Sequence, residues 1–234
     1  MRLLAILWLA TTLLGAAKAF ALAETYQPLS DGDWWTYEGT DGEVETRIVD
    51  GLVEVLGRTT HRILYTGGVN DTNENYWTVD DSGNVFLHGF YYPPTEFGLV
   101  YDPPILYLSS SPLFVGRTWQ TTTTFYTLPD TLYAGRYDIA FQIYEEVDLD
   151  LPVGLLHAFG AGPSIPSSAD LSLTSIDPIA QRGGRPDTWW SKGIGPVKFA
   201  LGGHLHLIDY GGAPTPVSNC SWGSIKSTFR TSAK

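Results

Sequence analysis

The chain has 234 residues, with 25 acidic and 14 basic side chains and a formal net charge of −11. This excess of negative charge disfavours nucleic acids and anionic membrane surfaces as partners, because both attract basic proteins. Cys220 is the only cysteine in the sequence, which excludes an intramolecular disulfide.

The first 23 residues have the layout of a secretory signal peptide. A basic start is followed by the mostly apolar run LLAILWLATTLLG and then by small residues. The run is too short for a membrane span, which needs about 20 apolar residues. We therefore expect residues 1–23 to be cleaved, leaving one β domain over residues 24–234 in the periplasm or outside the cell, with no membrane span.

Glycine, proline and aromatic residues are abundant after this segment, and no stretch of eleven residues has sustained helical spacing. This composition favours strands and turns over helices. Near the start of the domain, Asp41-Gly42 and Asp50-Gly51 are suited to hairpin turns. They predict three antiparallel strands over residues 34–40, 43–49 and 52–57.

Two later segments are predicted as loops and one as a long strand. The prolines of residues 91–104 and the glycine- and proline-rich residues 160–187 indicate ordered loops. Between them, residues 139–153 alternate between apolar and polar side chains, and only Glu145 breaks the rule. A bulge or an inward carboxylate is expected at Glu145. Strands of this length are typical of curved sheets and barrels.

Sequence motifs for enzymes are mostly lacking, and His204-Leu205-His206 is the sharpest candidate for metal chemistry. On a strand, His204 and His206 would point to the same side and could share one zinc ion with a third ligand. Two ordinary strand histidines would look the same. Glu146, Asp148 and Asp150 share another strand face and could bind calcium, or could form a solvated face.

Adjacent aromatic pairs, such as Trp34-Trp35, Tyr91-Tyr92 and Trp189-Trp190, are the remaining signal. Neighbours on a strand face opposite ways, so one ring of each pair should enter the core and the other should face outward. The outward rings could stack on sugars, line an apolar mouth or simply pack under loops. The candidate ligand-binding residues are Trp35, Tyr92, Tyr101, Trp119 and Trp190.

Three motifs resemble the TapB-like exported bacterial proteins. They are Tyr26-x-Pro28-Leu29-x-x-Gly32-x-x-Trp35-x-Tyr37, Pro112-Leu113-x-Val115-Gly116-x-Thr118-Trp119 and Trp189-Trp190-x-Lys192-Gly193-Ile194-Gly195-Pro196-Val197-Lys198. The resemblance implies a curved antiparallel meander or an incomplete barrel, half-barrel, calycin-like or lipoprotein-carrier-like, with loop insertions. It implies no catalytic residues. The glycines of the third motif suit a tight bend, so we expect this motif to act as a structural latch.

These observations favour an exported, non-enzymatic, acidic β-protein. We expect it to bind a small apolar or amphipathic ligand, or to dock an envelope protein, without a cofactor. One alternative is a metal-binding protein or metal-dependent hydrolase that uses zinc or calcium, centred on His204 and His206. Another is an extracellular carbohydrate-binding module that uses Trp34, Trp35, Trp189 or Trp190.

Overall fold

The computed structural model describes residues 25–110, 112–164, 184–200 and 204–212. The predicted signal peptide, Cys220 and most of the predicted loop over residues 160–187 lie outside these ranges. The described residues form a barrel whose strands follow the chain around its wall. The strands are β1 (Trp34–Glu38), β2 (Val44–Val55), β3 (Arg58–Thr66), β4 (Glu74–Val79), β5 (Val85–Tyr92), β6 (Phe97–Leu108), β7 (Thr118–Leu128), β8 (Leu132–Leu151), β9 (Gly154–Pro163), β10 (Thr188–Ser191), β11 (Gly195–Phe199) and β12 (His206–Gly211).

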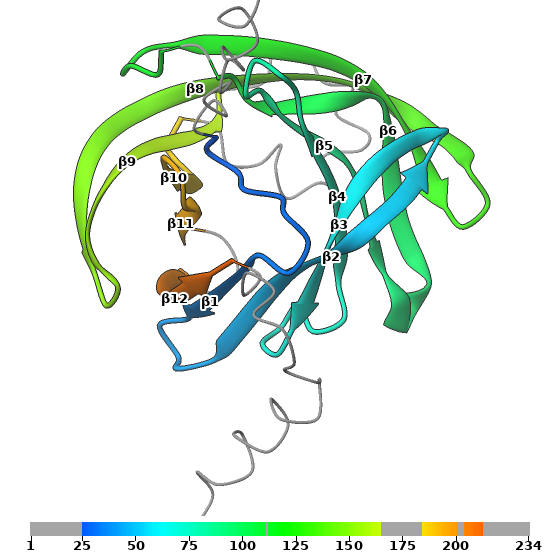
Figure 1. The fold of residues 1–234 in the computed structure, drawn as a ribbon. Coiled ribbons are helices and arrows are strands. Elements are labelled where there is room, and N and C mark those ends of the chain that lie inside the picture. Colours follow the sequence, from blue (N-terminus) through cyan, green and yellow to red (C-terminus); the bar gives the residue numbers. More distant parts are fainter. Residues whose placement is uncertain (1–24, 111, 165–183, 201–203, 213–234) are drawn as a thin grey trace, which may run out of the picture.

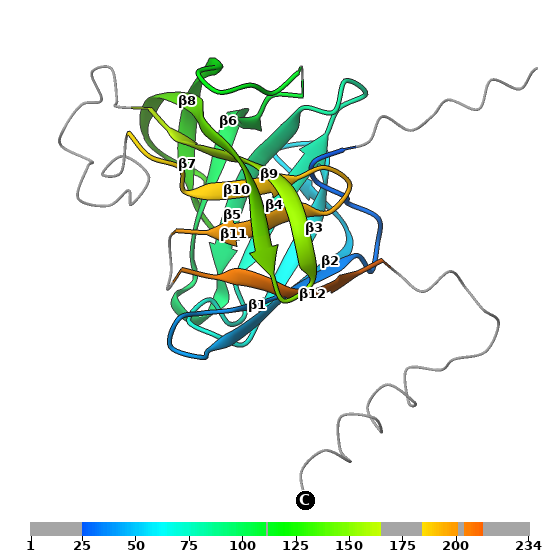
Figure 2. The same ribbon diagram turned by 90° about the vertical axis from the view of Figure 1, so that its left-hand side faces the viewer.

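The barrel is closed, which corrects the expected open meander or incomplete barrel (Figure 1). Each strand pairs antiparallel with its neighbour in sequence, and β1 also pairs with β12, from Trp34 with Gly211 to Glu38 with His206. Figure 2 shows β10, β11 and β12 one above the other on one side of the wall, with the β8–β9 hairpin running across them. Closure satisfies the backbone groups that an open sheet would leave unpaired at its edges. No described residue belongs to a helix that is long and apolar enough to cross a membrane.

The predicted turn at Asp50-Gly51 is wrong. Gly51, with a φ of 71°, lies in a bulge inside a continuous β2, where the register shifts between Val49 and Leu52. The chain reverses instead at Leu56-Gly57, where φ is positive at both residues, as a type I′ hairpin turn requires. An Asp-Gly pair suits both settings, because aspartate tolerates the left-handed region and glycine adopts it readily.

After this bulge the β2–β3 hairpin packs over the outer face of the barrel. Val55 joins Tyr76 of β4 and Val100 of β6 in a small second core. Arg58 at the tip of the hairpin forms an ion pair with Asp102 of β6, with 2.9 Å between Nη2 and Oδ1. We call this contact between the hairpin and the outer wall the outer clasp.

The predicted loop over residues 91–104 is mostly strand. β5 extends to Tyr92, a single 3₁₀ turn covers Pro93–Thr95, and β6 runs through Pro103 and Pro104. The pairing of β6 with β5 jumps from Val100 to Ile105, so the two prolines lie where no bond to β5 is required. The expected bulge in the long strand is confirmed by a register shift between Ile143 and Glu145.

The weakest seam of the described barrel lies between β11 and β12, which share one registered pair, Lys198 with His206. Two side chains of β1 reach across this seam. Trp35 donates its indole N–H to the carbonyl oxygen of Ile194 at 2.5 Å, and Tyr37 donates its hydroxyl to that of Pro196 at 2.8 Å. The first and third sequence motifs therefore meet here. The latch expected of the third motif stays a prediction.

Replacing Tyr37 by phenylalanine should lower the free energy of unfolding by about 1–2 kcal/mol, because the buried carbonyl of Pro196 loses its donor. Urea denaturation of the purified protein would measure this change. Tyr210→Phe is the matched control, since Tyr210 lies on β12 of the same seam with its ring 41% exposed. Equal effects of the two substitutions would contradict the role of Tyr37 in closing the barrel.

Candidate functional site

The barrel encloses a cavity of about 550 Å³. Eight strands make a barrel that side chains can fill, and larger strand numbers leave free space inside. Twelve strands in the described chain therefore account for a lumen. The lining residues are Gln27, Trp35, Tyr37, Arg47, Ile63, Tyr65, Asn70, Asn73, Asn75, Trp77, Leu87, Phe90, Phe97, Leu99, Tyr101, Ile105, Tyr107, Phe125, Thr127, Ala134, Tyr137, Ile139, Thr188, Trp190, Pro196, Phe199 and Leu205.

Most of the wall is apolar and aromatic. Tyr107 of β6 contacts Trp77 and Trp190, with ring centroids 5.4 and 6.0 Å apart, and so links opposite parts of the lumen. Leu87 and Ile105 are buried against the same space. This part of the cavity can accept an apolar group by burying it among rings and branched side chains.

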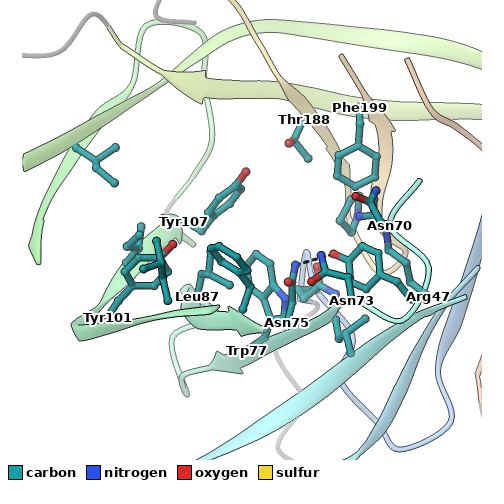
Figure 3. Close-up of a pocket in the computed structure, with 18 of the residues that line it drawn as sticks. Arg47, Asn70, Asn73, Asn75, Trp77, Leu87, Tyr101, Tyr107, Thr188 and Phe199 are labelled. Carbon is teal, nitrogen blue, oxygen red and sulfur yellow. Dashed lines mark hydrogen bonds between the residues drawn. The ribbon is translucent and has the colours of Figure 1, made fainter. Parts of the chain in front are cut away.

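One side of the cavity is polar. Figure 3 shows Arg47 and three asparagines, Asn70, Asn73 and Asn75, on one side of the space and Tyr101 on the other. The asparagines come from β4 and the connection before it, and Arg47 comes from β2. We call this group of four residues the polar pole.

Arg47 is held in a cage of aromatic rings. Its guanidinium carbon lies 4.8 Å from the ring centroid of Tyr37, 4.5 Å from that of Tyr65 and 4.1 Å from that of Phe199. Desolvated cation–π contacts of this kind are stabilising, and they also hold the planar group in place.

Glu45 is the counter-ion of Arg47 and is itself fully engaged. Its Oε1 accepts from Arg47 Nε at 2.8 Å and its Oε2 accepts from Asn70 Nδ2 at 2.6 Å. The side chain of Glu45 is 2% exposed and that of Arg47 is 12% exposed. Burial lowers the pKa of Arg47, but the interactions with Tyr65, Glu45 and Tyr37 outweigh burial and raise it, so the guanidinium is charged.

The phenols beside Arg47 stay neutral. Burial raises the pKa of Tyr37, of Tyr65 and of Tyr107, and Arg47 only partly offsets this effect. Tyr65 accepts a hydrogen bond from Asn75 Nδ2 at 2.7 Å, and its own hydroxyl hydrogen can still be donated. The cavity therefore presents one cation and several neutral hydrogen-bonding groups.

Four buried polar atoms on the cavity wall have no hydrogen-bond partner among the described residues. They are the side-chain oxygens of Asn73 and Asn75 and the indole nitrogens of Trp77 and Trp190. Buried polar groups in native proteins are nearly always bonded, since an unsatisfied group costs about 1–3 kcal/mol. Four such atoms around one cavity indicate a bound polar molecule or water.

An N-terminal strap, residues 25–33, crosses one mouth of the barrel (Figure 1). One end is fixed by a hydrogen bond from Gly193 N–H to the carbonyl oxygen of Thr25 at 2.8 Å. At the other end Gly32 N–H donates to the carbonyl oxygen of Val49, and Val49 N–H donates to that of Asp33. Gln27 of the strap is buried and lines the cavity. Phe97, which also lines the cavity, is 39% exposed.

The structure brings three of the five predicted ligand-binding residues to the cavity: Trp35, Tyr101 and Trp190. Trp119 is not part of the lining. It stacks on Phe141 with centroids 5.7 Å apart and donates to the carbonyl of Leu106. Tyr92 ends β5, where it pairs with Phe97, and is not itself part of the lining.

The predicted metal residues do not share a strand face. His204 lies in a turn with a φ of 54°, before β12 begins at His206. His206 Nε2 is 3.8 Å from Glu38 Oε2. Within the described ranges, no group of three or more histidine, cysteine, aspartate or glutamate side chains could hold a metal ion. The zinc hypothesis stays a prediction that elemental analysis would test.

Of the three candidate calcium ligands, Glu146 and Asp148 lie beside a histidine, and the calcium hypothesis stays a prediction. His157 of β9 lies 3.2 Å from Glu146 and 2.9 Å from Asp148, which neighbour it across the β8–β9 hairpin. The outward tryptophans, Trp189 and Trp34, are engaged in contacts with neighbouring residues of the barrel. Trp189 donates to Glu145 at 2.5 Å and lies under the ammonium group of Lys198. Trp34 packs against Gly211, where an added Cβ would lie 2.8 Å from the indole nitrogen.

Arg47 and the asparagines were not predicted from the sequence. A usable signal exists in β2, where Glu45, Arg47 and Val49 lie on the same face of the strand. Two residues of opposite charge that are two positions apart, on the same face as a buried valine, indicate an ion pair on the core side of a strand. The asparagines lie in a polar segment that resembles an ordinary turn.

Comparison with known proteins adds little. No family model and no curated protein matches the chain, so the resemblance to TapB-like proteins stays a prediction. A candidate exported protein with a YmcC-like fold from Bacteroides fragilis is 12% identical, with a TM-score of 0.43 over 80% of this chain and 99% of its own. A candidate lipoprotein from Parabacteroides distasonis is 13% identical, with a TM-score of 0.36 over 81% and 99%. Similarity at this level transfers neither fold nor function.

Proposed function

We propose that the protein is exported and binds an amphipathic small molecule inside its barrel. The observation that supports this proposal best is a cavity with an apolar wall and the polar pole at one side. Its volume of about 550 Å³ falls within the usual range for small-molecule sites. At about 30 Å³ for each water-sized group, it suits a ligand of roughly 15–20 non-hydrogen atoms. Export is supported by the layout of the first 23 residues.

Binding without catalysis fits the ionisable groups of the lining. These are Arg47 and tyrosines. Arg47 stays charged, and burial raises the pKa of Tyr37 and Tyr65, so neither phenol can act as a general base near neutral pH. Such groups can orient a ligand, which is the role we assign to them.

An uncharged fluorescent probe would test the proposed function. N-phenyl-1-naphthylamine brightens in apolar surroundings, and we expect a saturable increase with the purified protein. Ala134→Trp should weaken this binding, because Ala134 lines the cavity and an indole would fill part of it. Leu155→Trp adds the same ring at a position that is 71% exposed and should have no effect.

Two outcomes would count against an internal binding site. The first is a fluorescence response that never saturates, and the second is an equal response in both tryptophan variants. Native mass spectrometry after incubation with a lipid extract would then show which molecules the wild-type protein retains. An absence of adducts would end the proposal for extracted lipids.

A further inference from the structure

We infer that the ligand carries a carboxylate head group and that Arg47 binds it. This inference rests on the proposed function, since it assigns the head group of a molecule bound in the same cavity. It follows from three properties of the polar pole: unused donors on Arg47, a preset orientation of its guanidinium, and adaptable amides around it.

The first property is the surplus of donors. A guanidinium has five N–H groups in a planar fork. Arg47 donates Nε–H to Glu45, and no described residue accepts from its two terminal nitrogens. Four donors on a residue that lines the cavity therefore remain for a ligand. A planar pair of carboxylate oxygens matches two of them at once.

The second property is that the donors are already oriented. The rings of Tyr37, Tyr65 and Phe199 hold the guanidinium in place. Glu45 has both oxygens occupied by Arg47 Nε and Asn70. A ligand thus meets the cationic edge of this ion pair and pays little entropy to order the side chain.

The third property is the set of unpartnered polar atoms on the wall of the same cavity. The oxygens of Asn73 and Asn75 are buried without partners, and rotation of an amide exchanges its oxygen with its nitrogen. The indole N–H of Trp77, in a residue only 8% exposed, is also unsatisfied. These groups can bond the head-group atoms that Arg47 does not reach.

The apolar wall then receives the tail of the ligand. The polar pole and Tyr101 lie at opposite sides of the cavity in Figure 3. Dodecanoate has twelve carbons and two oxygens, about 14 non-hydrogen atoms, which fits within the roughly 15–20 that the volume allows. Dodecanoate is therefore the test molecule.

Displacement of N-phenyl-1-naphthylamine by dodecanoate, dodecanol and dodecyltrimethylammonium, each below its micelle concentration, tests the head group. The three share a tail and differ in charge. We expect dodecanoate to bind about 10–100-fold more tightly than dodecanol, as charge-assisted hydrogen bonds predict, and the cation to bind most weakly.

A double variant tests the assignment to Arg47. Glu45→Gln with Arg47→Gln removes both charges, so that no lone buried charge is left. It should bring dodecanoate to the affinity of dodecanol, with the two ligands compared within the same variant. The matched control, Asp50→Asn with Arg62→Gln, neutralises another ion pair whose residues are not part of the cavity lining, and should keep the preference.

The outcomes separate this inference from the proposed function. If dodecanol and dodecanoate bind equally to the wild-type protein, the carboxylate assignment is wrong and the binding site stands. If the control variant loses the preference for dodecanoate over dodecanol as the double variant does, Arg47 is not the residue that binds the carboxylate. If neither the probe nor any amphiphile binds, the proposed function itself fails. Should the double variant not fold, the wild-type comparison alone decides.

Discussion

Replacing Glu45 by leucine is expected to lower the free energy of unfolding by about 3–5 kcal/mol. The substitution leaves the guanidinium of Arg47 buried without its counter-ion, and the loss of one partner of a buried pair costs about this much. Asn70 also loses its acceptor. Urea denaturation followed by tryptophan fluorescence would measure the change.

Two controls identify the cause of this loss. Glu43→Leu changes an exposed carboxylate two residues earlier and should shift the free energy of unfolding by no more than about 0.5 kcal/mol. Combining Glu45→Leu with Arg47→Met should recover most of the lost stability, because apolar side chains can replace a buried ion pair at little cost. A double variant that is less stable than Glu45→Leu would mean that the aromatic cage needs its cation.

The same ion pair shows where sequence reasoning ends. Alternation of apolar and polar residues correctly predicted the all-β class and the bulge between Ile143 and Glu145. It assigns each side chain to a face, but it does not identify the neighbouring strand. The closure of the barrel depends on the pairing of Trp34 with Gly211, far apart in the chain, and no local pattern reports that contact.

The site was only partly predictable for a related reason. Large aromatic residues are recognisable as core candidates, and Trp35, Tyr101 and Trp190 do line the cavity. The polar pole combines Arg47 of β2 with asparagines before and on β4, and these asparagines look like surface residues within their own segment. Closure turns one face of β2 and of β4 toward the lumen, which brings Arg47 and Asn75 to the same cavity as Asn70 and Asn73 of the preceding connection.

The stability of the protein should also depend on pH through His88. This residue is 4% exposed, and its Nε2 lies 2.8 Å from the hydroxyl of Thr78. Burial, followed by the positive charge of Arg58 in the outer clasp, lowers the pKa of His88 to about 4 from an ordinary value of 6.5. The folded protein thus holds a neutral imidazole that the unfolded chain would protonate in mild acid.

The sign of the effect follows from proton linkage. Above pH 6.5 His88 is neutral in both states, and its contribution to stability is constant. Between pH 6.5 and 4 the unfolded chain binds a proton that the folded protein excludes, so the free energy of unfolding falls as the pH falls. At about 1.36 kcal/mol for each pKa unit, the total loss from this group approaches roughly 3 kcal/mol.

Carboxylates titrate in the same range, so the measurement must isolate His88. We expect His88→Gln to be less stable than the wild-type protein at pH 7 and to lose roughly 2–3 kcal/mol less between pH 7 and 4.5. Arg58→Gln should give a smaller version of the same change, because it removes the positive charge that helps to exclude the proton. Parallel pH profiles for wild-type protein and His88→Gln would show that this imidazole accepts a proton as readily in the folded barrel as in the unfolded chain. Burial beneath the outer clasp would then fail to account for its environment.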